Sequence, residues 1–355
     1  MSGGVDSSVA ASLLLDSDYD VTGITMKLWE NPPKEAEDIC SRTCCSIEDV
    51  EDARSVAFSL GIPFYVLNMK EIFNKEVVDY FVSEYIKGRT PNPCMLCNKI
   101  VKFEEMLRKA LMLGHNFIAT GHYVSKEYDE KADRYLLKKA VDMTKDQSYF
   151  LYMMNQKQLK HTLFPNGGYT KEEIRKIAEK KGLVNSKKPD SQDICFISNK
   201  HYSDFIIEWT GNSFSPGEFI DSNGNVLGKN KGHIYYTIGQ RKGIGISAEK
   251  PLYVIDKDHL SNKVTVGYKD QVKVKGLIAE KLNFIPFDFP EKDFKAKVKV
   301  RYSSNEIPAN IKVLEKDKVY VEFANSKEII SPGQSVVFYQ DEYVIGGGVI
   351  TQKKI

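Results

Sequence analysis

The chain opens with a short run of glycines and hydroxyl-bearing residues, directly before an apolar segment with helical spacing. The run is Ser2, Gly3, Gly4, Val5, Asp6, Ser7 and Ser8, and the segment carries Val9, Ala10, Leu13 and Leu14. Glycines allow backbone N–H groups to approach a phosphate closely, hydroxyls add donors, and the helix N-terminus adds a positive dipole. The run lacks the Gly-Lys-Ser/Thr ending of a Walker A loop. The sequence therefore predicts a phosphate-binding loop that does not perform simple γ-phosphoryl transfer.

Cysteines form a second group of residues able to do chemistry. Cys94 and Cys97 lie three residues apart, just before an expected helix whose N-terminal dipole would lower the pKa of a nearby thiol. Cys195 stands alone far along the chain. A single Cys-x-x-Cys is compatible with redox chemistry, with a metal site or with chance, and these interpretations stay open at this point. The remaining three, Cys40, Cys44 and Cys45, are explained equally well as small buried hydrophobic residues.

The segments that must position these residues alternate between strands and helices over the first two thirds of the chain. We expect strands at 21–26, 64–67 and 117–120, and helices at 50–60, 71–87, 99–113 and 170–182. Capping boxes open two of these helices, Ser46 with Asp49 and Thr170 with Glu173. This alternation is typical of a parallel sheet with helices on both faces.

After about residue 200 the pattern changes to short strands between Gly and Asn turns, such as Asn223-Gly224. Apolar residues alternate with lysines from Phe294 to Val300, as in a strand with one buried face. We therefore predict an α/β parallel-sheet domain at 1–200, a small central domain at 201–270 and a C-terminal β-barrel domain at 271–355.

Composition limits the class of protein. The chain has 355 residues, of which 42% are hydrophobic, enough to bury the cores of two or three domains. Its formal net charge is only +2, so any polyanion must meet a local patch of charge. The sequence has no apolar run of the roughly 18 residues that a membrane span needs, and no secretion signal. We expect a cytoplasmic protein with no membrane association.

The opening Ser-Gly-Gly-x-Asp-Ser resembles the signature of the PP-loop ATP pyrophosphatases, in which a substrate oxygen attacks the α-phosphorus of ATP. Together with further strings, it makes the chain similar from end to end to the bacterial tRNA-specific 2-thiouridylases. These strings lie at 90–99, 119–123, 145–149, 190–196, 237–241, 301–302 and 332–334. In that family a hydrophobic strand precedes the loop, whereas this sequence begins at Met1. We therefore expect one position of the sheet to be empty and ATP binding to be weakened.

The resemblance implies a PP-loop domain, a small central domain and a C-terminal β-barrel, with ATP and Mg²⁺ as cofactors. The run from Ser2 to Ser8, with Met26 and Gly121, would bind ATP. A uridine flipped out of the anticodon loop would lie among Asn92, Pro93 and Cys94. Further contacts to tRNA would come from His122, Lys145, Asp146, Gln147, Arg301, Tyr302 and Gln334.

The implied reaction modifies the wobble uridine of the tRNAs for Lys, Glu and Gln. Adenylation of the C2 oxygen would create a good leaving group, and a persulfide on Cys195 would then deliver sulfur to C2. A cysteine desulfurase or sulfur-relay protein would load Cys195. Cys97 would act as the nucleophile that takes over the sulfane link, which leaves a Cys97–Cys195 disulfide for a reductant to reopen.

Three alternatives remain open at the level of sequence. Cys94 stands where other family members carry Asp, so it is either a weak base or a ligand, with Cys97 and Cys195, of an iron–sulfur cluster. The chain could also be a PP-loop enzyme of a small metabolite, or a non-catalytic metal- or RNA-binding protein. The lysines from Lys295 to Lys299 are interpreted as a solvated strand face in preference to an RNA-binding row.

Overall fold

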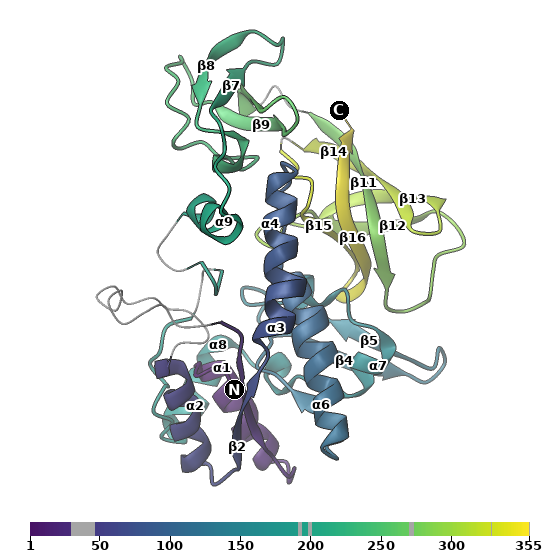
Figure 1. Cartoon of the computed structure of the whole chain (residues 1–355). Helices are drawn as coiled ribbons and strands as arrows, with labels where there is room; N and C mark the ends of the chain where they lie inside the picture. The colour runs from purple at the N-terminus through teal and green to yellow at the C-terminus, as the bar shows by residue number, and fades with distance from the viewer. Residues whose placement is uncertain (30–46, 191–193, 198–200, 270–272, 328, 355) are drawn as a thin grey trace. The chain divides into compact units, whose positions relative to one another are not determined.

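The computed structural model describes residues 1–29, 47–190, 194–197, 201–269, 273–327 and 329–354 (Figure 1). These residues group into two compact units. The first comprises Met1–Val78, Pro93–Asn199 and Asp341–Val344, and the second Asp79–Asn92, Lys200–Gln340 and Ile345–Ile355. Cys40, Cys44, Cys45 and the capping residue Ser46 lie outside the described residues. Within the described ranges, no helix is both long and apolar enough to cross a membrane.

The first unit begins with alternating helices and parallel strands, as the sequence predicts. In chain order these are α1 (Val5–Leu15), β1 (Gly23–Lys27), α2 (Ile47–Ser59) and β2 (Phe64–Asn68). β1 pairs in parallel with β2, and Gly23 lies opposite Phe64. Further along, β3 (Ile118–Ala119) pairs in parallel with β6 (Thr162–Leu163). The helices bury apolar residues such as Val9, Val56 and Ile174 in one core, which fixes α1 and α2 beside the loop.

Two of the expected helices contain π-helical segments. The stretch predicted at 71–87 consists of α3 (Lys70–Phe73), η2 (Asn74–Val78) and α4 (Asp79–Ile86). The stretch predicted at 99–113 begins earlier, with α5 (Pro93–Leu96), η3 (Cys97–Glu105) and α6 (Met106–Met112). A π-helical turn holds an additional residue and often lies at a functional site. Apolar periodicity does not reveal such a turn, because both helix types bury one face.

The rest of the first unit includes a hairpin that the sequence did not predict. Its strands β4 (Ser125–Asp129) and β5 (Arg134–Lys138) are antiparallel, and Lys138 of β5 lies opposite Tyr343. Short elements follow, namely η4 (Ser148–Leu151), α7 (Gln156–Lys160), β6 and η5 (Pro165–Gly168). The predicted capping box of Thr170 and Glu173 is present and opens α8 (Lys171–Lys180).

The second unit contains a small sheet and a barrel. The sheet has the order β8-β7-β10-β9 and a core that includes Phe219, Val254 and Val264. Its elements are α9 (Tyr202–Thr210), β7 (Gly217–Ile220), β8 (Val226–Asn230), η6 (His233–Tyr235), β9 (Tyr253–Asp258) and β10 (Lys263–Gly267).

The barrel confirms the prediction of a C-terminal β-barrel. Its strands are β11 (Val274–Phe284), β12 (Phe294–Lys299), β13 (Ile307–Glu315), β14 (Lys318–Lys327), β15 (Ser335–Gln340) and β16 (Tyr343–Lys354). They follow the order β11-β14-β13-β12-β15-β16, and β16 pairs back with β11 and closes the barrel. The inner face is apolar, and Val298, Val321 and Phe338 are fully buried in it.

Candidate active site

The loop before α1 is tightly packed at two glycines, Gly3 within the loop and Gly121 in the segment beside it, and neither position has room for a side chain. A Cβ on Gly3, whose φ is +72°, would lie 2.4 Å from the carbonyl oxygen of Asp49. A Cβ on Gly121 would lie 2.6 Å from the carbonyl carbon of Asp6. Gly4 differs, because the nearest atom to its Cβ would be Ser2 Oγ at 3.5 Å. The loop is therefore held between α2 and the segment after β3, while the space above Gly4 is open.

The N-terminus of α1 has the features of an anion cradle. Gly4 is its N-cap and supplies no side chain to the first-turn N–H groups. The hydroxyls of Ser7 and Ser8 donate to the Gly4 carbonyl oxygen at 3.0 and 3.1 Å, and the Ser2 N–H donates to Ser7 Oγ at 3.0 Å. These hydrogen bonds fix the loop and leave the first-turn N–H groups directed along the helix axis. The loop fits the phosphates of ATP on geometry as well as on sequence.

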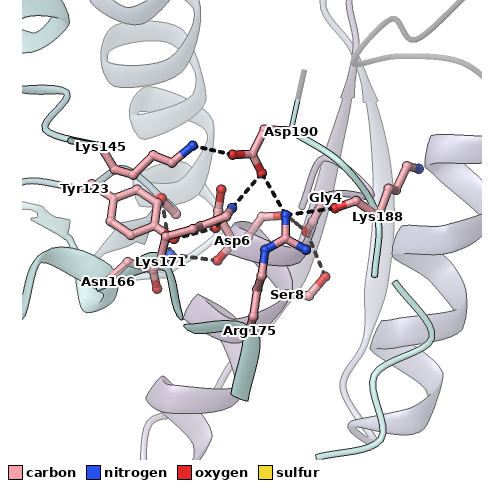
Figure 2. Close-up of polar contacts among 12 residues, drawn as sticks. Gly4, Asp6, Ser8, Tyr123, Lys145, Asn166, Lys171, Arg175, Lys188 and Asp190 are labelled. Atoms are coloured by element: carbon pink, nitrogen blue, oxygen red, sulfur yellow. Dashed lines mark hydrogen bonds and ion pairs between the residues drawn. The ribbon is translucent and has the colours of Figure 1, made fainter. Parts of the chain in front are cut away.

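Asp6 lies at the centre of a charged network (Figure 2). Its Oδ1 accepts from the Tyr123 hydroxyl at 2.7 Å and from Lys171 Nζ at 2.6 Å. Its Oδ2 accepts from no group in the part of the chain that the structure describes. Burial, and then the neighbouring charge of Asp6, raise the pKa of Tyr123, so its hydroxyl remains a donor. One carboxylate oxygen is therefore held and the other is available, which suits a carboxylate that binds Mg²⁺ through a single oxygen.

The same lysine connects Asp6 to Asp190. Lys171 Nζ lies 2.7 Å from Asp190 Oδ1, and Lys145 Nζ lies 2.8 Å from Asp190 Oδ2. Arg175 approaches Asp190 Oδ1 at 3.6 Å (Figure 2). Burial alone would raise the pKa of Asp190, but the hydrogen bonds from Lys145 and Lys171 outweigh it and lower that pKa. Two carboxylates thus share one buried ammonium group.

Two asparagines hydrogen-bond to the loop, and a lysine forms ion pairs with the helix that packs against it. Asn166 Nδ2 donates to the Asp6 carbonyl at 2.9 Å, and Asn185 Nδ2 donates to the Gly3 carbonyl at 2.9 Å. Lys188 contacts Asp49 at 2.6 Å and Asp52 at 2.5 Å. Although burial opposes it, these two carboxylates raise the pKa of Lys188. The Asp49 backbone that packs against Gly3 is therefore anchored by an ion pair.

A cavity of about 600 Å³ lies beside the loop. It is lined by Ser2, Ser7 and Met26, by Gly121 and His122, and by further residues of α1, β1, α6 and β3. Residues of both β1 and β3 line the cavity. Burial, and then the charge of Lys102, hold the pKa of His122 well below its usual value. His122 is therefore neutral at pH 7, and its Nδ1 is 2.9 Å from Thr120 Oγ1.

The three predicted catalytic cysteines differ in exposure. Cys94 in α5 is exposed, Cys97 at the start of η3 is buried, and Cys195 is intermediate. The residue after Cys195 is fixed, since the Phe196 ring packs 5.7 Å from that of Phe73. No group of three or more His, Cys, Asp or Glu side chains, among the described residues that include these cysteines, is arranged to hold a metal ion.

Sequence comparison assigns the family. Residues 1–199 match the model of the tRNA methyl transferase HUP domain, 203–268 that of the tRNA methyl transferase PRC-barrel domain, and 274–350 that of the aminomethyltransferase beta-barrel domain. The chain is 52% identical over 353 residues to the tRNA-specific 2-thiouridylase MnmA 1 of Thermoanaerobacter pseudethanolicus, covering 99% of this chain and 97% of that protein. The chain belongs to the tRNA-specific 2-thiouridylase family.

Other members of this family are similar to the same extent. MnmA of Acetivibrio thermocellus is 52% identical over 350 residues, and MnmA of Caldicellulosiruptor saccharolyticus is 51% identical over 350 residues. Each alignment covers 99% of this chain, with 97% and 96% of the respective relative. The family resemblance predicted from the sequence is therefore confirmed.

The residues expected to touch tRNA lie in both units. In the first, Asp146 is buried, and its Oδ2 accepts from Ser148 Oγ at 2.7 Å. Gln147 Oε1 accepts from the Tyr123 N–H at 3.0 Å. In the second, Arg301 and Tyr302 are exposed beyond the end of β12, while Gln334 Nε2 donates to the Thr90 carbonyl at 2.7 Å.

The residues that hold the loop of this 2-thiouridylase-family site were not predicted from the sequence. Tyr123, Lys171, Asp190, Asn166 and Asn185 fix the loop, yet most of them lie more than 100 residues away from it along the chain. Two of them did lie in strings that carry the family resemblance, Tyr123 at 119–123 and Asp190 at 190–196. Lys171 directly follows the predicted capping residue Thr170, but a lysine there is unremarkable without its partners.

Proposed function

We propose that this chain is an ATP-dependent tRNA sulfurtransferase that converts the wobble uridine of the tRNAs for Lys, Glu and Gln into 2-thiouridine. The observation that carries the proposal is the geometry of the loop. The space above Gly4 is open, and only Oδ1 of the Asp6 carboxylate is held by Lys171, so the loop suits a polyphosphate with a bound magnesium ion. Family membership favours tRNA over a small metabolite as the substrate. We further propose domains at 1–200, 201–270 and 271–355.

In the first stage the chain's residues hold ATP and tRNA for adenylation. The loop from Ser2 to Ser8 would bind the phosphates, and Met26 and Gly121 would lie against the nucleoside at the cavity. ATP supplies AMP, which turns the C2 oxygen into part of a good leaving group. Tyr123 and Lys171 keep the carboxylate of Asp6 in place while charge moves on the phosphates.

In the second stage sulfur replaces the activated oxygen. The terminal sulfur of a Cys195 persulfide forms a bond to C2, and AMP leaves with the oxygen and its bonding electrons. The Cys97 thiolate then attacks Sγ of Cys195, which breaks the sulfur–sulfur bond and leaves the terminal sulfur on the uridine. The product is a Cys97–Cys195 disulfide, which two electrons from a thiol reductant reopen. A cysteine desulfurase or a relay protein supplies the persulfide.

The persulfide route is supported better than an iron–sulfur cluster. A cluster needs Cys94, Cys97 and Cys195 to converge, whereas the described residues show no such metal-binding group and Cys94 is exposed while Cys97 is buried. Cys94 then acts beside the flipped uridine as a weak base. Colour in anaerobically purified protein that is lost in Cys94→Ala would favour the cluster instead.

Binding of tRNA would use residues of both units. Asn92, Pro93 and Cys94 would surround the flipped base, and the neutral His122 would offer a hydrogen bond without a charge. Lys145, Gln147, Arg301, Tyr302 and Gln334 would contact the rest of the RNA, whereas the buried Asp146 would orient its neighbours. We propose a cytoplasmic location, because the cysteine chemistry requires a reducing compartment.

The experiment that tests this function follows the modified nucleoside directly. Unmodified tRNA is incubated with the protein, Mg²⁺, ATP and a persulfide donor, and its nucleosides are analysed by mass spectrometry. We expect 2-thiouridine with the wild type and none with Cys97→Ser or Cys195→Ser, while both variants still bind tRNA and release pyrophosphate. Formation of 2-thiouridine by either variant would exclude the proposed sulfur transfer.

A further inference from the structure

Strand β12 carries a row of cationic side chains on its outer face. Ala296, Val298 and Val300 are buried in the barrel core, so the intervening residues point away from the core. Those residues are Lys295, Lys297 and Lys299, followed by Arg301 just after the strand. Alternate residues of a strand are about 7 Å apart, so the four charges extend over roughly 20 Å. We call these four residues the β12 row.

The strands on either side bring no negative charge to this row. On β13, Lys295 lies opposite Asn310 and Lys297 opposite Pro308. On β15, Lys297 lies opposite Tyr339 and Lys299 opposite Val337. No member of the row forms an ion pair with any other residue that the structure describes. The row therefore consists of like charges, each within a Debye length of the next, with no internal compensation.

Three other lysines of the barrel are compensated. Lys312 pairs with Glu322 at 3.0 Å, Lys318 with Glu280 at 3.4 Å, and Lys353 with Asp256 at 2.9 Å. The first two pairs join neighbouring strands of the barrel, the usual arrangement for charges on the outside of a sheet. Lys275, Lys281, Lys316 and Lys354 are exposed and have no ion pair with any described residue, but they are scattered over the barrel. What distinguishes the β12 row is therefore its regular spacing along one strand together with the absence of a carboxylate partner among the described residues.

We propose that the β12 row binds successive phosphates of an RNA strand. The inference rests on the proposed function, in which the substrate is a tRNA, and adds to it a surface that grips the backbone. A linear row matches a polymer with one charge per nucleotide better than a single anionic metabolite, which would meet one or two of the four cations. The residues opposite the row offer an anionic membrane little exposed apolar area, because Val337 and Tyr339 are fully buried and Pro308 is the exposed apolar residue among them.

The row supplies affinity and orientation without base specificity. Lysine contacts to phosphate release counterions and are the same for every sequence. The sequence alone favours a solvated face for Lys295 to Lys299, because alternation shows which residues point outward but not what lies opposite them. The register of β12 between β13 and β15 supplies that missing information.

The test is the salt dependence of tRNA binding. The dissociation constant is measured between about 50 and 300 mM KCl for the wild type and for the triple variant Lys295→Gln, Lys297→Gln and Lys299→Gln. Each lost phosphate contact lowers the slope of log affinity against log salt by about 0.7 to 0.9, so the slope should fall by about 2 to 3. Affinity near 150 mM salt should fall by about 10- to 50-fold.

Two matched variants control for charge and fold. Changing Lys312, Lys318 and Lys353 to Gln removes the same number of charges from the same unit, and we expect a slope change below about 1 because these lysines are already paired. Changing the three β12 lysines to Arg keeps the charge and should keep the slope. Unfolding midpoints should match the wild type, since Lys295 and Lys297 are exposed.

The outcomes separate this inference from the proposed function. Equal losses in the β12 variant and the charge control, or no loss in the β12 variant, would overturn the row as an RNA site. Vesicles of anionic phospholipid that bind the wild type, release the β12 variant and displace tRNA would assign the row to a membrane surface instead. If the wild type forms no 2-thiouridine while the β12 variant still shows the predicted fall in salt slope, the proposed function would be overturned and the β12 row would remain an RNA-binding site.

Discussion

The cations around the loop and the cations on β12 are the same residue types in opposite situations. Lys145, Lys171 and Arg175 each contact a carboxylate, and Lys171 contacts two of them. The members of the β12 row have no carboxylate partner among the described residues. Paired cations hold groups of the chain itself in place, whereas unpaired cations in a regular row are available to an external polyanion.

Burial explains why the consequences differ in size. The Lys171 side chain is only 11% exposed, so loss of its charge would leave two carboxylates close together with little solvent to screen them. Lys295 and Lys297 are exposed, so removal of their charges costs little in the free protein. Removing the charge of Lys171 should therefore alter the free protein as well as binding, while removing the charges of Lys295 and Lys297 should alter binding alone.

The largest effects are expected from the loop glycines, which sharpen the comparison between packing and binding. Gly4→Val should lower ATP-dependent pyrophosphate release by about 100-fold or more, equivalent to about 3 kcal/mol, because its side chain enters the open phosphate space. Its unfolding midpoint should stay near that of the wild type. Gly3→Ala should lower both, since its Cβ would overlap the Asp49 carbonyl. A Gly4→Val protein with normal pyrophosphate release would show that the loop is not the phosphate site.

The next effect concerns Lys171. Lys171→Met should weaken binding of magnesium ATP by about 10- to 100-fold, because Asp6 and Asp190 would then repel the phosphates. Titration calorimetry of protein shown to be folded measures it. Asp190→Asn in the same chain should restore part of the affinity, since it removes one of the two carboxylates that Lys171 bridges, although Lys145 and Arg175 still contact Asp190 in the single variant. Lys176→Met on the same helix is the control, because Lys176 pairs with Glu172 on the surface. A double variant weaker than Lys171→Met would mean that Lys171 only stabilises the fold.

A pH effect on stability is expected in the second unit. The ammonium group of its Lys257 is buried and has no carboxylate hydrogen-bond partner among the described residues, unlike the paired cations around the loop and unlike the exposed lysines on β12. Burial lowers the pKa of Lys257 to about 7, and its Nζ donates to the Tyr236 carbonyl at 2.7 Å. The unfolded chain binds more protons than the folded one from about pH 7 up to the ordinary lysine value, so the stability of this unit should rise with pH. The rise should be at most about 1.4 kcal/mol per pH unit.

The measurement must stay below pH 10. Burial raises the pKa of Tyr85 to about 12, so stability is lost when unfolded tyrosine ionises above pH 10. Denaturant unfolding between pH 6.5 and 9, followed by Trp209 fluorescence in a Trp29→Phe protein, reports the second unit. Lys257→Met should flatten the profile and should raise stability at pH 6.5. An equally steep profile in that variant would assign the pH dependence to another group.

The smallest effect is expected from a single paired lysine. Lys312→Gln should change the salt slope of tRNA binding by less than about 0.5, because Glu322 already compensates its charge. Lys297→Gln, one strand away, should change it by about 0.7 to 0.9. Equal slopes for these two variants would remove the distinction between paired and unpaired cations on this barrel.

Sequence predicted the elements better than the contacts between them. The loop, the Thr170 capping box and the alternation on β12 depend on neighbouring residues, so their chemistry is visible in the chain itself. The ion pair of Lys171 with Asp6 joins residues 165 positions apart, and either residue alone looks ordinary. The meaning of the β12 lysines depended on strand register, which alternation cannot specify. Cys94 and Cys97 were predicted to lie just before a helix, but they lie inside it, in α5 and η3, and the π-helical form of η3 left no periodic signal.

The π-helical segment at Cys97 determines how this helix responds to a change in chain length. An α-helix turns by about 100° per residue, and a π-helical turn accommodates roughly one more residue than an α-helical turn does. Deleting a single residue between Cys97 and Glu105 would let the segment relax into an α-helix, and because the full turn would still be completed, Cys94 and Cys97 would keep nearly the same direction relative to α6. Deleting a residue from α6 would instead rotate both thiols by about 100° relative to the rest of that helix. The additional residue of η3 is therefore one that this helix can lose without turning its cysteines away from their neighbours.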